Sequence, residues 1–223
     1  MTRSIVLRLM MKDWYLNRAL LMVVGVLGAV SIASLYLRHG VTSLLGMLLS
    51  LSAVMFLGIL IPTHTIVNER TQGNLPFVMS LPVSPMQYTT AKILANTVAF
   101  LALWLPIVAG MIGTVAGTHV YGGLIPLMLL AAFAPFVTFA LVVAVAIVTE
   151  SQAGSVAAHF ASNVGNGVAW FFIQRSPGFW ENLKSPVATW NETMVSILAL
   201  DIVTIVVALA LTFYLQSRKT DFI

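Results

Sequence analysis

Long apolar runs, separated by short polar stretches, follow one another along almost the whole chain. A helix needs roughly 20 apolar residues to cross a hydrocarbon core of about 30 Å. Runs of about that length or longer cover residues 19–37, 41–67, 93–116, 124–148, 151–173 and 194–215. Unpaired backbone amides are costly in lipid, so such runs predict helices, whereas a β-barrel would show alternating segments of about ten residues. The pattern predicts an all-α, multi-pass membrane protein with six transmembrane helices in a single transmembrane domain, residues 1–223.

Composition indicates that lipid is the main solvent of this chain. Hydrophobic residues make up 59% of it and charged residues 8%, whereas about a quarter of the residues in a soluble domain are charged. The mean hydropathy is +0.97. Cysteine is absent, which excludes disulfides, iron–sulfur clusters and thiolate zinc sites. The basic segment 1–18 precedes an apolar run longer than the hydrophobic region of a typical secretory signal, so we interpret it as an interfacial segment ahead of a retained anchor.

The distribution of basic residues predicts the orientation of the spans. With the N-terminus in the cytoplasm, eight of the eleven lysines and arginines lie inside and three lie outside. The three outer ones are Arg38, Arg175 and Lys184. The positive-inside rule favours this arrangement, which places both termini in the cytoplasm. The net charge of +4 is explained by this topology and requires no nucleic-acid partner.

The longer outer connection, residues 174–193, contains two Ser-Pro steps, Ser176-Pro177 and Ser185-Pro186. A serine at the N-cap accepts a hydrogen bond from an otherwise unpaired amide, and proline at the first helical position has no amide to lose. The steps therefore predict two short helices at the outer surface; the alternative is an irregular loop.

The longer inner connection is NERTQGNLPFVMSLPVSPMQYTTAK, residues 68–92. Ser84, with proline after it and Gln87 at the third helical position, forms a capping box that predicts the start of the helix entering the third span. Residues before proline avoid helical geometry, so Leu81-Pro82 should end a preceding short helix. A helix of about two turns is unstable alone in water. It should therefore pack against the N-terminal segment or dock into a soluble cytoplasmic partner.

These residues resemble the membrane subunits of the type-two class of ABC (ATP-binding-cassette) exporters. The shared pattern is an acidic-basic pair, a glycine, a short apolar helix, Leu-Pro, a serine or threonine, and a lysine entering the third span. It is carried here by Glu69-Arg70, Gly73, 75–81, Leu81-Pro82, Ser84 and Lys92. The step Lys12-Asp13-Trp14 in a basic N-terminal segment fits the same plan. Pro76 departs from the family pattern, because a helix-forming residue is expected at that position. This departure affects which residue begins the predicted short helix.

The resemblance implies the membrane permease subunit of an ATP-driven exporter, located in the cytoplasmic (inner) membrane of a prokaryote. Two permease copies, as a homodimer, would enclose the path, and two ABC ATPase subunits would bind the cytoplasmic coupling segment 68–92. The residues that would couple to the ATPase are Glu69, Arg70, Gly73, Leu75, Phe77, Val78, Leu81 and Pro82. The chain has no G-x-x-x-x-G-K-[ST] phosphate-binding loop, so ATP and Mg²⁺ would be bound by the partner and this chain would need no cofactor of its own.

Two groups of polar residues lie within the apolar runs. Ser155, His159, Asn163 and Asn166 fall on one stripe of the fifth span, which predicts either hydrogen bonds to neighbouring helices or a wet translocation path or dimer axis. Asp201 lies in the sixth span, where a carboxylate is costly unless it is paired, protonated or wetted. Arg175 or Lys184 could pair with it; otherwise it belongs to the same path.

Two other functions remain open from the sequence. An intramembrane enzyme would gather His159, Glu150 and Asp201 by folding, although none of the common hydrolase and metalloprotease motifs is present. A passive channel would use the same spans but leaves the coupling segment unexplained. The exporter interpretation expects no catalytic residue and no metal site on this chain.

Overall fold

The structure is a computed structural model that describes residues 2–37, 40–71, 84–117 and 121–218. Every regular element in these ranges is a helix, which confirms the all-α prediction. The elements are α1 (Thr2–Tyr36), α2 (Gly40–Pro62), the π-helix η1 (Thr63–Val67), α3 (Asn68–Thr71), α5 (Pro85–Ala116), α6 (Leu124–Thr149), α7 (Gln152–Arg175), α8 (Phe179–Leu183) and α9 (Glu192–Ser217).

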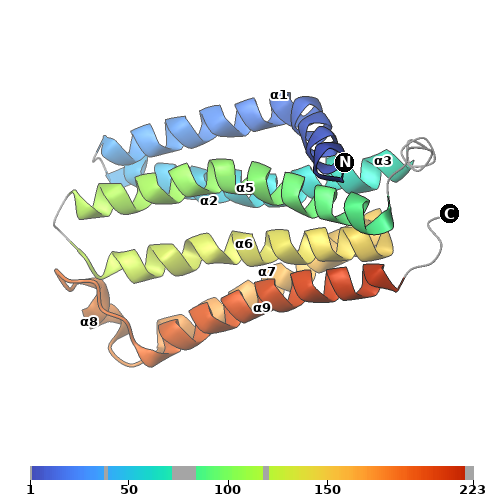
Figure 1. The fold of residues 1–223 in the computed structure, drawn as a ribbon. Helices are drawn as coiled ribbons and strands as arrows, with labels where there is room; N and C mark the ends of the chain where they lie inside the picture. Colours follow the sequence, from blue (N-terminus) through green and yellow to red (C-terminus); the bar gives the residue numbers. More distant parts are fainter. Residues whose placement is uncertain (1, 38–39, 72–83, 118–120, 219–223) are drawn as a thin grey trace.

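The long helices lie side by side in one bundle and alternate in direction along the chain (Figure 1). The first turns of α1, the short helix α3, the start of α5 and the last turn of α9 lie at one end of the bundle, which we call the α3 end. The short helix α8 lies at the opposite end, the α8 end (Figure 1). Helix α6 is central, because it packs against α2, α5, α7 and α9.

Five helices in the described ranges are long and apolar enough to cross a membrane. They are Ile5–Tyr36, Val41–Val67, Met86–Ala116, Leu124–Thr149 and Glu192–Ser217. Helix α7 has 24 residues, a length of about 36 Å, but its polar residues leave it outside this set. It runs along the bundle beside α6 (Figure 1). A membrane protein with several spans is thus supported, whereas the sixth span stays a prediction.

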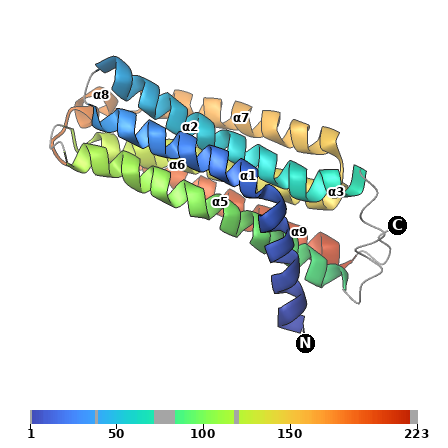
Figure 2. The same cartoon turned by 90° about the horizontal axis from the view of Figure 1, so that it is seen from above.

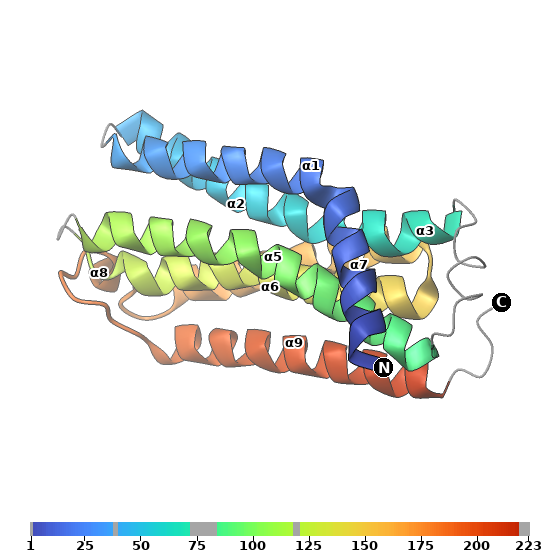
Figure 3. The ribbon, with the colours of Figure 1, turned by 45° about the horizontal axis from the view of Figure 1, so that its top comes forward.

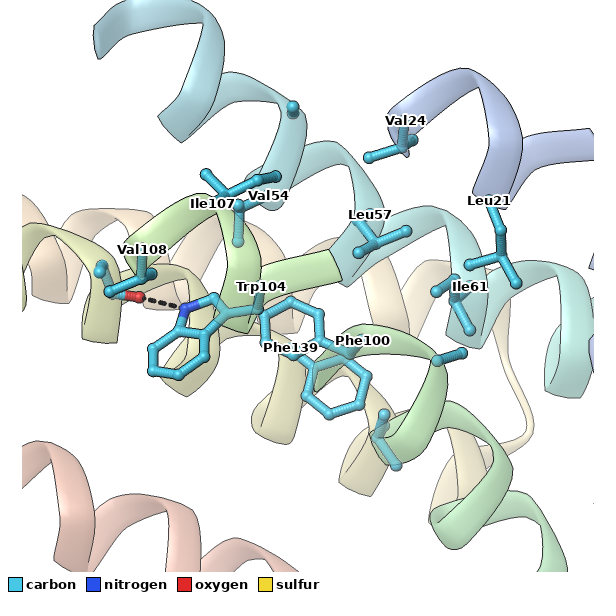
Figure 4. Close-up of a cluster of buried hydrophobic side chains, with 14 of the residues drawn as sticks. Leu21, Val24, Val54, Leu57, Ile61, Phe100, Trp104, Ile107, Val108 and Phe139 are labelled. Atoms are coloured by element: carbon cyan, nitrogen blue, oxygen red, sulfur yellow. Dashed lines mark hydrogen bonds between the residues drawn. The ribbon is translucent and has the colours of Figure 1, made fainter. Parts of the chain in front are cut away.

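An aromatic core joins α5 to α6 at the middle of the bundle. The rings of Phe100 and Phe139 stack with their centroids 4.3 Å apart, and both side chains are fully buried. The indole Nε1–H of Trp104 donates a hydrogen bond to the Ala132 carbonyl oxygen at 2.8 Å (Figure 4). Buried Trp needs such a partner, because an unpaired N–H would be costly in an apolar interior.

Helix α1 is continuous from Thr2 to Tyr36, so residues 2–18 and nearly all of the first span belong to one helix. Its N-terminal part nevertheless turns away from the bundle axis and crosses the other helices (Figures 2 and 3). With 35 residues, α1 is about 52 Å long, far more than the roughly 30 Å of a hydrocarbon core. The bend accommodates that excess length.

The capping box at Ser84 is confirmed. The Ser84 hydroxyl accepts the Gln87 amide and the Gln87 side chain accepts the Ser84 amide, with proline at the first position of α5. The short helix predicted before Leu81-Pro82 lies outside the described residues.

The outer segment differs from its prediction of two short helices. One short helix, α8, forms between the end of α7 and the start of α9, and it begins after Gly178, whose φ of 70° lies in the left-handed region. The hydroxyl of Ser176 instead donates back to the Ile173 carbonyl at 2.7 Å. The second helix is absent because the Ser185 hydroxyl accepts the Val187 amide, two residues on, in a tight turn.

Candidate functional site

Four charged side chains from three helices meet at the α3 end of the bundle. Lys92 of α5 lies between Asp13 of α1 and Glu69 of α3, with its Nζ 2.9 Å from Asp13 Oδ2 and 2.6 Å from Glu69 Oε2. Lys12 Nζ pairs with the other Glu69 oxygen, Oε1. We call Lys12, Asp13, Glu69 and Lys92 the ion cluster. Lys92 is 1% exposed, and only Lys12 reaches solvent to a substantial extent.

Neutral groups complete the coordination of the buried charges. Lys92 donates a further hydrogen bond to the Thr65 carbonyl at 2.7 Å, and the Tyr88 hydroxyl donates to Glu69 Oε2 at 2.9 Å. The Asn96 side chain donates to the Lys92 carbonyl at 2.7 Å, and its oxygen accepts the Thr65 hydroxyl at 2.9 Å. Buried charges require this kind of pairing and hydrogen bonding, because water no longer solvates them.

The π-helix η1 explains how the end of α2 contributes to the site. The Asn68 amide bonds to the Thr63 carbonyl, five residues back, rather than four as in an α-helix. Single π turns of this kind weaken the regular ladder and are frequent at functional sites. Here the Thr65 carbonyl lies in the π turn and accepts the Lys92 ammonium.

The ion cluster is balanced, with two ammonium groups facing two carboxylates. Burial raises the pKa of the Glu69 carboxyl, but Lys92 and Lys12 beside it outweigh burial and hold that pKa below its ordinary value. Glu69 therefore stays ionised at neutral pH. Removing the Lys92 charge would leave two buried carboxylates with only the partly exposed Lys12 beside them in the described part of the chain, which costs about 3–5 kcal/mol.

The ion cluster forms a joint between helices. The carboxylates are already occupied by cations, and the described residues contain no group of three His, Cys, Asp or Glu side chains that could hold a metal. The ion cluster and the Thr65 carbonyl link α1, η1, α3 and the start of α5. Residues 72–83 lie between α3 and α5 in the sequence.

Of the coupling residues predicted from the sequence, the described part of the chain contains Glu69 and Arg70. Glu69 lies in the ion cluster, and Arg70 follows it in α3. Gly73, Leu75, Phe77, Val78, Leu81 and Pro82 lie outside the described residues. The sequence pattern contained all four charges of the ion cluster but did not indicate that they meet. It also missed Thr65, Tyr88 and Asn96, for which it offers no distinguishing signal.

The predicted polar stripe of α7 divides into two parts. Asn166 donates to the Thr138 hydroxyl at 3.3 Å, and Thr138 and Ser162 hydroxyls lie 2.7 Å apart. We call Thr138, Ser162 and Asn166 the α6–α7 seam. His159 and Asn163 instead contact each other on α7, with Asn163 Nδ2 2.9 Å from His159 Nε2.

Ser155, the first residue of the stripe, is buried, and its hydroxyl donates to the Ser151 carbonyl one turn back. Interhelical hydrogen bonding therefore accounts for Asn166 but not for the whole stripe. Ser162 was not part of the prediction, although a hydroxyl three residues after His159 could have been included.

Asp201 is half-buried in α9 and makes no hydrogen bond or ion pair with any residue that the structure describes. The suggested partner Arg175 stacks on the Phe171 ring at 3.9 Å, and Lys184 is exposed.

Gln216 donates to the Ile147 carbonyl, which sets the end of α9 beside the end of α6. Asp201 lies fifteen residues before Gln216, about 22 Å along the helix. Glu150, which comes directly after α6, is thus far from Asp201.

Family models, curated proteins and solved structures yield no match to this chain.

Proposed function

We propose that this protein is the membrane permease subunit of an ATP-driven ABC exporter and works as a homodimer. Separate ATPase subunits bind residues 68–92 at the cytoplasmic face and move that segment. The ion cluster passes the movement to α1 and α5, and the paired permeases open a path between them. The proposal extends the resemblance of residues 68–92 and of Lys12-Asp13-Trp14 to the exporter family.

The observation that carries the proposal is the position of Lys92. It is the first charged residue after residues 72–83, and it is fully buried against a carboxylate on either side. One of these carboxylates, Glu69, stands just before the same segment. A loop that served only to connect two spans would not require buried charges at both of its ends, because burying them is costly.

The path would be lined from α7 and α9. The half-buried His159 and Asn163 of α7 and Asp201 of α9 have no hydrogen bond to another helix in the described part of the chain. Such residues are expensive against lipid. A second permease copy or a water-filled path would relieve that cost. No comparable observation favours the enzyme or the passive channel.

Affinity purification from the native membrane in a mild detergent tests the proposal. An ATP-binding subunit should copurify in stoichiometric amount. The variant Phe77→Asp/Leu81→Asp should lose this subunit, whereas Val187→Asp, an exposed position of the outer segment, should retain it. Recovery of the permease with no stoichiometric ATP-binding protein would contradict the proposal.

A second experiment separates force transmission from stability. The double variant Asp13→Asn/Lys92→Met keeps the ion cluster neutral, since Lys12 and Glu69 remain paired. If the ion cluster transmits movement, this variant should keep its thermal stability and still bind the ATPase subunit. In nanodiscs, however, the ATPase rate of the complex should equal that of the ATPase subunit without the permease. A complex whose coupled ATPase rate equals that of the wild type would assign the ion cluster a structural role only.

A further inference from the structure

The N-terminal part of α1 has two unlike faces. One is buried at Leu9, Asp13 and Asn17, spaced four residues apart. Leu9 packs against Tyr88 and Ala91 of α5 in a small apolar cluster. Asp13 is bound to Lys92, so this face is fixed to the bundle by both packing and charge.

The opposite face is exposed and apolar at its centre. Leu7, Met11 and Trp14 are spaced four and three residues apart, which places them on one stripe, and they are 54%, 57% and 44% exposed. Exposed Arg8 and Arg18 flank them. We call these five residues the N-terminal face. Arg18 lies over the ring of Tyr15, with its guanidinium carbon 4.2 Å from the centroid.

Among the described residues, the N-terminal face has cations and no free anion beside it. Both carboxylates near it, Asp13 and Glu69, are buried and neutralised by Lys92 and Lys12. Lys12 is held by Glu69 and so is not available to a ligand. The two arginines make no ion pair with the described residues, and guanidinium groups can bind phosphate oxygens in a bidentate manner.

The orientation of this part of α1 suits a membrane surface. It turns across the bundle at the α3 end, whereas the rest of α1 runs along the bundle (Figures 2 and 3). Helices with an apolar stripe and basic flanks lie in the plane of the interface with the stripe in the headgroup–acyl boundary. An anionic leaflet attracts such basic residues.

We propose that the N-terminal face binds anionic phospholipid headgroups through Arg8 and Arg18, while Leu7, Met11 and Trp14 enter the acyl boundary. The ion cluster holds the back of the helix, so the lipid contacts a surface that is fixed relative to α5. This proposal does not depend on the exporter function, because it needs neither ATP nor a second subunit.

Quenching of Trp14 fluorescence by brominated lipid tests the proposal on the full-length protein in nanodiscs. Phosphatidylcholine discs receive a small share of either brominated phosphatidylglycerol or brominated phosphatidylcholine, and the signal of Trp14→Phe is subtracted to isolate Trp14. The anionic lipid should quench more strongly, and the difference should shrink at high salt, which screens exposed charges. Equal quenching by the two lipids would overturn the proposal, and so would no quenching by either.

The variant Arg8→Gln/Arg18→Gln should lose most of the preference for the anionic lipid. Each basic side chain near an anionic leaflet contributes a factor of about five in affinity, so the pair should lose more than ten-fold. Arg8→Lys/Arg18→Lys should retain a preference, which controls for folding. Arg175→Gln is the matched control, because Arg175 also stacks on an aromatic ring but lies at the end of α7 that leads into α8. A preference unchanged in the glutamine pair would contradict the proposal.

Discussion

The ion cluster and the α6–α7 seam show two different ways of joining helices in an apolar protein. At the α3 end, the ion cluster joins α1, α3 and α5 through full charges, and three of its four side chains are buried. Along the bundle, the α6–α7 seam joins its two helices through hydroxyls and an amide. Charged pairs resist separation strongly but are costly to bury, whereas neutral interhelical hydrogen bonds in membranes contribute only about 0.6 kcal/mol each. We therefore expect the ion cluster to resist separation more strongly than the α6–α7 seam.

The largest expected effect is that of Lys92→Met. It leaves Asp13 and Glu69 buried with Lys12 as the one cation paired with them in the described part of the chain, so the free energy of unfolding should fall by about 3–5 kcal/mol. Thermal unfolding in detergent measures this. The exposed Lys184→Met is the matched control and should stay within about 0.5 kcal/mol of the wild type. A similar change in both variants would show that the ion cluster contributes no more to stability than an exposed lysine does.

Glu69→Gln should have a smaller and pH-dependent effect. The variant loses charge-assisted hydrogen bonds worth about 2 kcal/mol at neutral pH. Because Lys92 and Lys12 hold the pKa of Glu69 below its ordinary value of 4.5, its stabilising contribution is complete above that pH and is lost as the pH falls through the lowered pKa. The difference in melting temperature between wild type and variant should thus narrow in acid. A melting-temperature difference that widens in acid would contradict a lowered pKa of Glu69.

The smallest effect should come from the α6–α7 seam. Thr138→Val removes the hydroxyl that contacts both Ser162 and Asn166, and should cost about 0.6 kcal/mol for each lost hydrogen bond. Asn163→Leu provides a comparison on α7, because within the described residues Asn163 hydrogen-bonds only to His159 of its own helix. It should leave the stability unchanged in a detergent-solubilised monomer. A loss from Thr138→Val as large as that from Lys92→Met would remove the contrast between the two joints.

Local signals in the sequence predicted the start of α5 and the helical runs, but neither Ser-Pro step of the outer segment caps the start of a helix. The capping box at Ser84 forms as expected because its partners are three residues apart. The start of the last helix was placed at residue 194, and α9 begins at Glu192 because the Asn191 side chain caps the Met194 amide. The all-helical bundle followed from the apolar runs in the same way.

Contacts between distant residues could not be predicted from the pattern. Asp13 and Lys92 are 79 residues apart, and Lys12 and Glu69 are 57 apart, so their pairing depends on how α1 crosses α5. The prediction of a second outer helix at Ser185-Pro186 was wrong for a similar reason, because contacts with a distant segment decide its structure. The Ser185 carbonyl accepts the Gly123 amide, and a side chain at Gly122 would meet the Pro186 carbonyl at 2.5 Å. Packing against the α5–α6 turn thus holds this segment out of a helix.

The π-helix η1 also sets the rotational phase of the short helix α3 that comes after it. A turn with five-residue bonding contains one residue more than an α-helical turn, and one residue corresponds to about 100° of rotation around a helix axis. Glu69 lies just beyond this turn and points at Lys92. Deleting a single residue within Thr63–Val67 would restore a regular helix and rotate Glu69 away from its partners by about a quarter turn. The one extra residue of the π turn is thus sufficient to direct Glu69 toward Lys92 and so to bring α3 into the ion cluster.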